Sequence, residues 1–213
     1  MPRTLITCFS LALLCSCASL PGFFLPTVSD ERFEAFIAYE ASKILQVSEN
    51  AHKAGRYKFF LAKFPRADIL GLSLGGHRIF ISYELTRRAY AQNSKLWLFR
   101  HTLAHEIAHD VLGHVKNEYA LSLNAVPRSA GQITGRDLGL PALFSFRNYS
   151  ATSELAADRK AIEYWQKIGW DCRIWIKLFR GFLDQGYIGD LDHATEERLN
   201  HAIRVCDSGT RWK

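Results

Sequence analysis

The sequence predicts an α+β fold, a mainly helical domain with a small antiparallel sheet. Two observations favour this class. Apolar residues recur at helical spacing in several long segments, whereas short β-prone runs are confined to residues 58–82. A chain of 213 residues that is 48% hydrophobic also suits one domain with a sizeable core, because a division in two would leave both parts small. We therefore expect a single folded domain over residues 29–213.

The first residues are predicted to be a secretion signal outside this fold. Arg3 supplies a positive start, and the apolar stretch from Leu5 to Leu14 is shorter than a transmembrane helix requires. Small residues follow this stretch, so we expect the chain to be cleaved near them.

The four residues Leu14-Cys15-Ser16-Cys17 are similar to a bacterial lipobox. In this interpretation residues 1–17 hold the signal and Cys17 carries the lipid, and ordinary cleavage after Ala18 is the alternative. Ala18 rather than Asp follows the lipidated cysteine, which by analogy with such lipoproteins favours the outer membrane. We therefore expect a lipoprotein of the bacterial cell envelope that faces the periplasm and contacts the membrane through its lipid anchor.

Residues 18–28 are predicted to be a linker from this anchor to the domain, because they contain Gly22 and Pro26 and show no helical period. Ser29 can then cap a helix that ends near Gly55. The apolar positions of this helix recur at helical spacing: Phe33, Phe36, Ile37, Ala41, Ile44 and Leu45.

Three short β-prone runs follow, over residues 58–64, 69–74 and 78–82. The pair Gly75-Gly76 predicts a turn between the last two runs. We expect the three runs to form the small, mostly antiparallel sheet.

Two helices are predicted next, over residues 83–92 and 96–115, and the second contains His105-Glu106-Ile107-Ala108-His109. Successive helical residues turn by about 100°, so the two histidines lie roughly 40° apart on one face and can bind one tetrahedral zinc ion. Glu106 lies beside them and can accept a proton from zinc-bound water, whose pKa the metal lowers to about 7. The alternative, histidines that line a core without partners, would cost several kcal/mol. The sequence therefore predicts one zinc ion per chain.

His114 is not expected to be the third zinc ligand. On a continuing helix it lies about 500° beyond His109 and points roughly 140° away from it. The third ligand must therefore come from elsewhere in the chain.

Residues 117–148 contain several Gly and Pro residues and no sustained period. A loop of this length inside a compact domain is usually functional, so it is predicted to be a lid or a substrate-selecting loop, with disorder as the alternative.

A helix that starts at Thr152-Ser153 and runs to about Ile168 contains Glu154 and Asp158, two carboxylates on one face. Glu154 can be the third zinc ligand, while Asp158 accepts the free N–H of a ligand histidine and fixes its tautomer. The alternative is that both are solvated acids, favoured at a helix start by the helix dipole. The upstream histidine pair favours the zinc interpretation.

Two more helices are predicted, over residues 173–183 and 193–206. Cys172 and Cys206 lie at the beginning of the first and the end of the second. In an oxidising envelope compartment the two cysteines can form a disulfide, and two buried thiols are the alternative that the sequence leaves open.

Taken together, these patterns resemble the gluzincin zinc metallopeptidases of family M forty-eight, the family of HtpX, BepA, LoiP and the CAAX prenyl proteases. The likeness covers roughly residues 57–203, and the chain is most similar to the small lipoprotein members. The residues that carry it form four ordered pieces: Gly75 to Phe80, His105 to His109 with His114 after it, Glu154 to Arg159, and His193 to Arg198.

The resemblance implies a zincin-type domain in which His105, His109 and Glu154 bind zinc and Glu106 is the catalytic base. Asp158 matches the family's acid that orients a ligand histidine. The late segment implies two further catalytic residues: His193 and Arg198 would polarise the substrate carbonyl and stabilise the oxyanion, or hold neighbouring acids.

In zinc peptidases of this architecture, the last strand before the zinc helices is an edge that pairs with extended substrate. This implies a substrate strand that includes Gly76, Arg78, Ile79 and Phe80, and ordinary core sheet is the alternative. The chain departs from the family pattern at Ala194 and Leu74, where Pro is usual, and at Ile69-Leu70-Gly71 in place of an Asn-Ala start. These departures affect substrate contacts and leave the metal ligands intact.

The expected function is therefore a zinc-dependent endopeptidase of the cell envelope that cleaves unfolded or misassembled polypeptides by Glu-assisted attack of zinc-bound water. The alternative is a zinc-containing but proteolytically silent binding or chaperone-like protein, which would have no need for a general base at residue 106. The net charge of +6 is scattered along the chain, so it does not predict nucleic-acid binding and fits an anionic membrane surface better.

Overall fold

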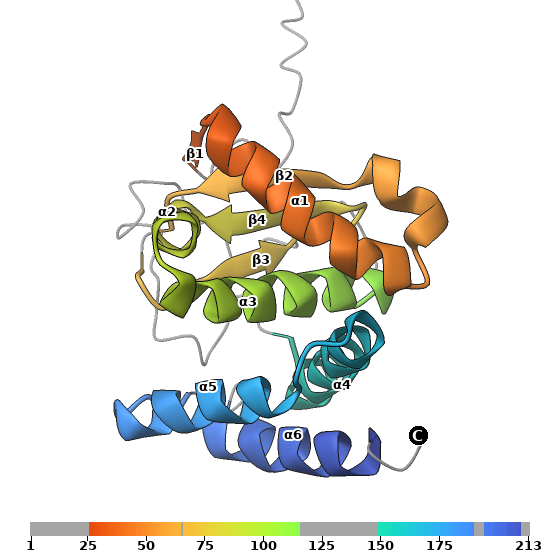
Figure 1. The fold of residues 1–213 in the computed structure, drawn as a ribbon, viewed down its shortest axis with the longest axis vertical. Coiled ribbons are helices and arrows are strands. Elements are labelled where there is room, and N and C mark those ends of the chain that lie inside the picture. The colour runs from red at the N-terminus through yellow and green to blue at the C-terminus, as the bar shows by residue number, and fades with distance from the viewer. Residues whose placement is uncertain (1–25, 65, 116–148, 190–193, 210–213) are drawn as a thin grey trace, which may run out of the picture.

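The computed structural model describes residues 26–64, 66–115, 149–189 and 194–209. In these residues a four-stranded sheet and α1 (Glu31–Val47) lie on one side of α3 (Asn93–Val111), and the C-terminal helices lie on the other (Figure 1). The mixture of helices with one small sheet confirms the predicted α+β class.

The sheet consists of β1 (Thr27–Val28), β2 (Lys58–Ala62), β3 (Gly71–Ser73) and β4 (Arg78–Ser82), in the order β1-β2-β4-β3. It is mixed rather than antiparallel, because β2 and β4 run parallel while the other two pairs are antiparallel. The chain crosses from β2 to the outer position at β3 and then returns through a tight turn to insert β4 between them.

The strand predicted to be a substrate-binding edge is therefore internal, and that prediction is wrong. Arg78, Ile79 and Phe80 pair with β2 on one side and with the β3 hairpin on the other, and Gly76 lies in the hairpin turn with a positive φ of 59°. Ile79, Phe80 and Ile81 are all buried, as expected for a strand enclosed by neighbours. Among the described residues, β3 is the edge on this side of the sheet.

The end of the predicted linker is also part of the fold. Thr27 and Val28 pair with Ala62 and Leu61 of β2, and Val28 packs against the core. The prediction of a linker is wrong for these two residues, because an apolar β-branched side chain there completes the sheet.

Most helices begin and end within a few residues of their predicted positions, but α1 ends eight residues before the predicted end near Gly55. Asp30, rather than Ser29, caps α1 by accepting from the N–H of Arg32, and α1 ends at Val47 before a short 3₁₀ helix over Ala51–Arg56. The remaining helices are α2 (Tyr83–Ala91), α4 (Ala151–Ile168), α5 (Arg173–Asp184) and α6 (Thr195–Gly209).

The central position of α3 explains its unusual composition. Every residue from His101 to His109 is buried, because β3 and β4 pack on one side of the helix and α4 and α5 on the other. A helix enclosed in this way brings its polar side chains into the interior, where each needs a partner.

A disulfide between Cys172 and Cys206 joins the start of α5 to α6. It resolves the alternative that the sequence left open and closes a loop with a sequence separation of 34 residues. None of the helices in the described part of the chain is long and apolar enough to span a bilayer.

Candidate metal centre

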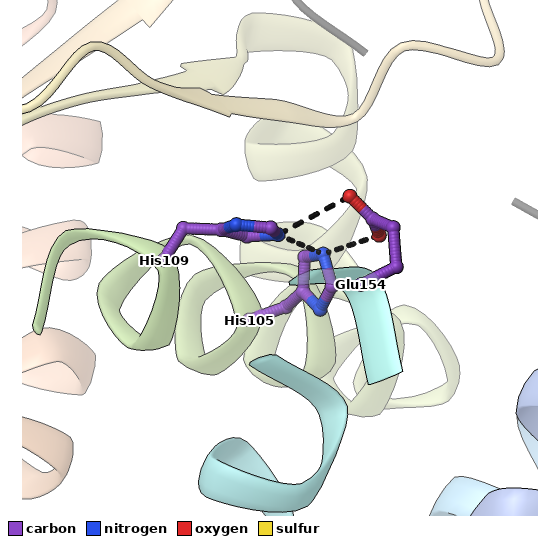
Figure 2. Close-up of side chains that lie close together, drawn as sticks. All are labelled: His105, His109 and Glu154. Carbon is purple, nitrogen blue, oxygen red and sulfur yellow. Dashed lines mark hydrogen bonds and ion pairs between the residues drawn. The ribbon is translucent and has the colours of Figure 1, made fainter. Parts of the chain in front are cut away.

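Three buried side chains from two helices converge between α3 and α4. His105 and His109, one turn apart on α3, point toward Glu154 in the first turn of α4 (Figure 2). The Nε2 atoms of the two histidines are 2.9 Å apart, and carboxylate oxygens of Glu154 lie 3.1 Å from Nε2 of His105 and 3.3 Å from Nε2 of His109. The structure thus brings together all three predicted ligands.

Their spacing fits a metal ion. The ligand atoms lie within 4.8 Å of one another, and two ligands of a tetrahedral zinc with bonds of 2.0–2.1 Å are about 3.3 Å apart. Two imidazoles and one carboxylate form one of the ligand sets found in catalytic zinc sites, which keep a fourth position open for water or substrate. The side chains present therefore suit zinc.

The charges around the cluster also favour a cation. Burial alone would lower the pKa of His105, but the carboxylates of Glu154 and Asp158 outweigh it and raise that pKa to about 10. Burial lowers the pKa of His109 to about 3. The buried carboxylates of Glu154 and Asp158 therefore favour a positive charge at the cluster, as a metal-binding site requires.

Asp158 and Arg198 support the His105 ring from behind. Oδ1 of Asp158 lies 2.9 Å from Nδ1 of His105, so the carboxylate can accept the proton of that nitrogen and leave Nε2 for a metal. Arg198, on α6, donates to both oxygens of Asp158 over 2.7 Å. Burial opposes ionisation, but the charge of Arg198 outweighs it and lowers the pKa of Asp158.

Arg198 also lies 3.5 Å from the carboxylate of Glu154. Arg198 therefore holds two neighbouring acids, which is one of the two roles predicted for it. A role in stabilising an oxyanion stays a prediction.

His114 lies against His109, contrary to the predicted orientation. Helix α3 ends at Val111, and Gly113 adopts a positive φ of 64° that reverses the chain. As a result Nδ1 of His114 is 2.9 Å from Nδ1 of His109. The expectation that His114 points away assumed that the helix continues past this residue. Instead, His114 can form a hydrogen bond with Nδ1 of His109 while remaining outside the ligand set.

Glu106 is buried next to the ligands. Burial raises the pKa of its carboxyl to about 7, and a hydrogen bond from the backbone of Ser73 partly opposes that rise. Because a carboxylate only accepts, the donor is the Ser73 N–H. One carboxylate oxygen of Glu106 has no hydrogen-bond partner among the described residues, so it is available to a water or a substrate.

A close approach of β3 to α3 brings Ser73 next to Glu106. A Cβ atom at Gly71 would lie 2.8 Å from both Cγ of Glu106 and Cγ2 of Thr102, closer than side chains normally come. Glycine at this position therefore allows the strand to lie directly over the carboxylate of Glu106.

The outer side of β3 faces the site. The N–H of Leu74 and the C=O of Leu70 bond to residues of the β4 hairpin. Because successive residues of a strand point their backbone groups to opposite sides, those of Gly71 and Ser73 point away from β4. The edge that the sequence placed on β4 is thus formed by β3.

Tyr149, which sequence reasoning missed, covers part of this edge. Its hydroxyl donates to the C=O of Ser73 over 2.8 Å, and its ring stacks on His109 with centroids 3.7 Å apart. The only sequence signal is its place immediately before Ser150, the residue that caps α4.

His101, one turn before His105, was also not singled out. It is buried against Trp175, with ring centroids 4.1 Å apart, and neither ring nitrogen has a hydrogen-bond partner in the described part of the chain. Burial lowers its pKa to about 3, so the ring is neutral. It extends the row of histidines along α3 without joining the ligand set.

Three predictions fall on residues outside those that the structure describes. They are the catalytic role of His193, the lipidation of Cys17 with the preceding signal, and the lid over residues 117–148.

Comparison of the chain with family models, curated proteins and solved structures finds no match in any of the three. The chemistry of the site must therefore be inferred from its own side chains.

Proposed function

We propose that the protein is a zinc-dependent endopeptidase of the bacterial cell envelope, of the gluzincin type that its sequence resembles. The observation that carries the proposal is a buried carboxylate, Glu106, beside a cluster of two histidines and one glutamate. Binding a structural metal requires no such carboxylate, whereas hydrolysis requires a base at that position.

His105, His109 and Glu154 would hold one zinc ion per chain. The metal would lower the pKa of a bound water to about 7 and polarise a substrate carbonyl. Glu106 would take a proton from the attacking water and return it to the leaving amine. Its pKa of about 7 suits both steps near neutral pH.

The substrate is proposed to be an extended, unfolded or misassembled polypeptide. The outer backbone groups of β3 lie beside Glu106, and they can pair only with a chain whose own backbone hydrogen-bonding groups are unpaired. A folded protein conceals these groups in its own secondary structure. The proposed substrate strand is therefore β3 rather than β4.

The proposed location is the periplasmic face of the outer membrane, with a lipid on Cys17 as the anchor. The disulfide between Cys172 and Cys206 supports an oxidising compartment. Expression in a Gram-negative host tests the anchor. The parent should fractionate with the outer membrane and incorporate labelled fatty acid, and Cys17→Ser should do neither; unchanged fractionation of the variant would refute lipidation.

Digestion of an unfolded protein such as reduced casein tests the activity. We expect the purified protein to cleave it, a zinc chelator to stop cleavage, and about one equivalent of zinc per chain to restore it. A zinc-loaded protein that binds casein without cleaving it would instead favour a proteolytically silent binding or chaperone-like protein.

A further inference from the structure

Both outward-facing backbone groups of Ser73 are already engaged by side chains of the protein itself. Its N–H bonds to Glu106, and its C=O accepts the hydroxyl of Tyr149 over 2.8 Å. Ser73 is the last residue of β3, and Tyr149 links it to His109 of the cluster of His105, His109 and Glu154. The edge strand is therefore already occupied at Ser73.

Tyr149 contacts the site in a second way. Its ring stacks on His109 at an interplanar angle of 20° and lies 5.9 Å from the ring of His114. The side chain thus bridges the edge strand and one of the ligand histidines. It comes from the residue just before the cap of α4, so its position is fixed from the same helix that supplies Glu154.

We propose that Tyr149 is a built-in competitor of the substrate, which an extended peptide must displace from the C=O of Ser73 in order to pair with β3. This inference rests on the proposed function. An incoming peptide N–H and the tyrosine hydroxyl are both neutral donors to the same carbonyl. Displacement therefore exchanges one hydrogen bond for another of similar strength, and the tyrosine weakens peptide binding moderately without abolishing it.

The experiment measures peptide affinity in a protein that cannot cleave. A fluorescent, unstructured peptide would be titrated into the zinc-loaded Glu106→Gln protein and into the double variant that also carries Tyr149→Phe. The second substitution removes the hydroxyl but keeps the ring over His109. The Kd should fall by about 2- to 10-fold, the range expected for one neutral hydrogen bond. Tyr39→Phe, an exposed tyrosine on α1, should leave it unchanged.

A second peptide of the same sequence, with every backbone nitrogen methylated, tests the mechanism. It has no N–H to donate to Ser73, so Tyr149→Phe should not tighten its binding. Zinc content should be the same in all variants, because the ring over the ligand is kept.

The outcomes separate this inference from the proposed function. The competitor role is wrong if the first peptide binds but Tyr149→Phe does not lower its Kd. It is also wrong if Tyr149→Phe lowers the Kd of the methylated peptide by the same factor. In both cases the peptidase proposal stands. If neither peptide binds any zinc-loaded variant, and casein is not cleaved by the parent, both fail.

Discussion

Oδ1 of Asp158 lies 2.9 Å from Nδ1 of His105, on the side of the ring opposite the nitrogen that faces Glu154. Asp158 is completely buried, and Arg198 donates to both of its oxygens. The pair therefore fixes the tautomer and the orientation of one ligand ring through a carboxylate that is itself held in place. This arrangement links α3, α4 and α6 at a single point.

Replacement of this acid should weaken metal binding. We expect Asp158→Asn to raise the Kd for zinc by about 10- to 100-fold, because the amide loses the charge that orients His105 and neutralises Arg198. Zinc affinity measured against a competing chelator checks this. Asp184→Asn, an exposed residue at the end of α5, is the control. Equal affinities of the two variants would show that Asp158 does not support the ligand.

The contact between His114 and His109 should likewise support metal binding by the His109 ring. His114→Ala should lower zinc affinity by about 10-fold, because Nδ1 of His109 loses its partner. His114→Gln should recover part of the loss, since the amide oxygen can accept the same proton. The exposed His52→Ala is the control. If the alanine and glutamine variants both bind zinc as the parent does, the contact has no role in holding the ligand.

The close approach of β3 to α3 predicts that Gly71→Ala impairs hydrolysis. The added methyl would lie 2.8 Å from Cγ of Glu106 and displace either the strand or the carboxylate. We expect a loss of casein cleavage of at least about 10-fold, as for a catalytic group moved by a fraction of an ångström, with zinc content retained. Gly181→Ala meets nothing within 4 Å and should be active. Parental activity in Gly71→Ala would mean that the strand can shift without consequence.

The local part of this site follows from helical periodicity. The spacing of His105 and His109, and that of Glu154 and Asp158, place each pair on one face of a helix, and the structure shows both pairs facing the same cluster. These relationships depend only on the geometry of single helices, which the sequence pattern reports directly.

The remaining features depend on long-range structure. The insertion of β4 between β2 and β3 is a choice of strand order, which three short β-prone runs cannot specify. His114 returns to His109 because α3 ends at Val111, four residues before the predicted end at residue 115, at a point marked only by Gly113. Tyr149 has no sequence signal that links it to Ser73, since 76 residues separate them and the contact forms only in the folded chain.

The central claim is that Glu106 is a general base beside a bound zinc ion. Glutamine keeps its volume and its bond from Ser73 but cannot take a proton at neutral pH. Glu106→Gln should therefore retain about one zinc per chain and lose about 10²- to 10⁴-fold in casein hydrolysis, a loss that more substrate does not restore. Glu31→Gln, exposed on α1, should match the parent.

The most direct measurement is thus the rate of casein cleavage by folded, zinc-loaded Glu106→Gln protein, with zinc content determined on the same sample. We expect full zinc content with almost no cleavage. Full zinc content with cleavage at the parental rate would contradict it.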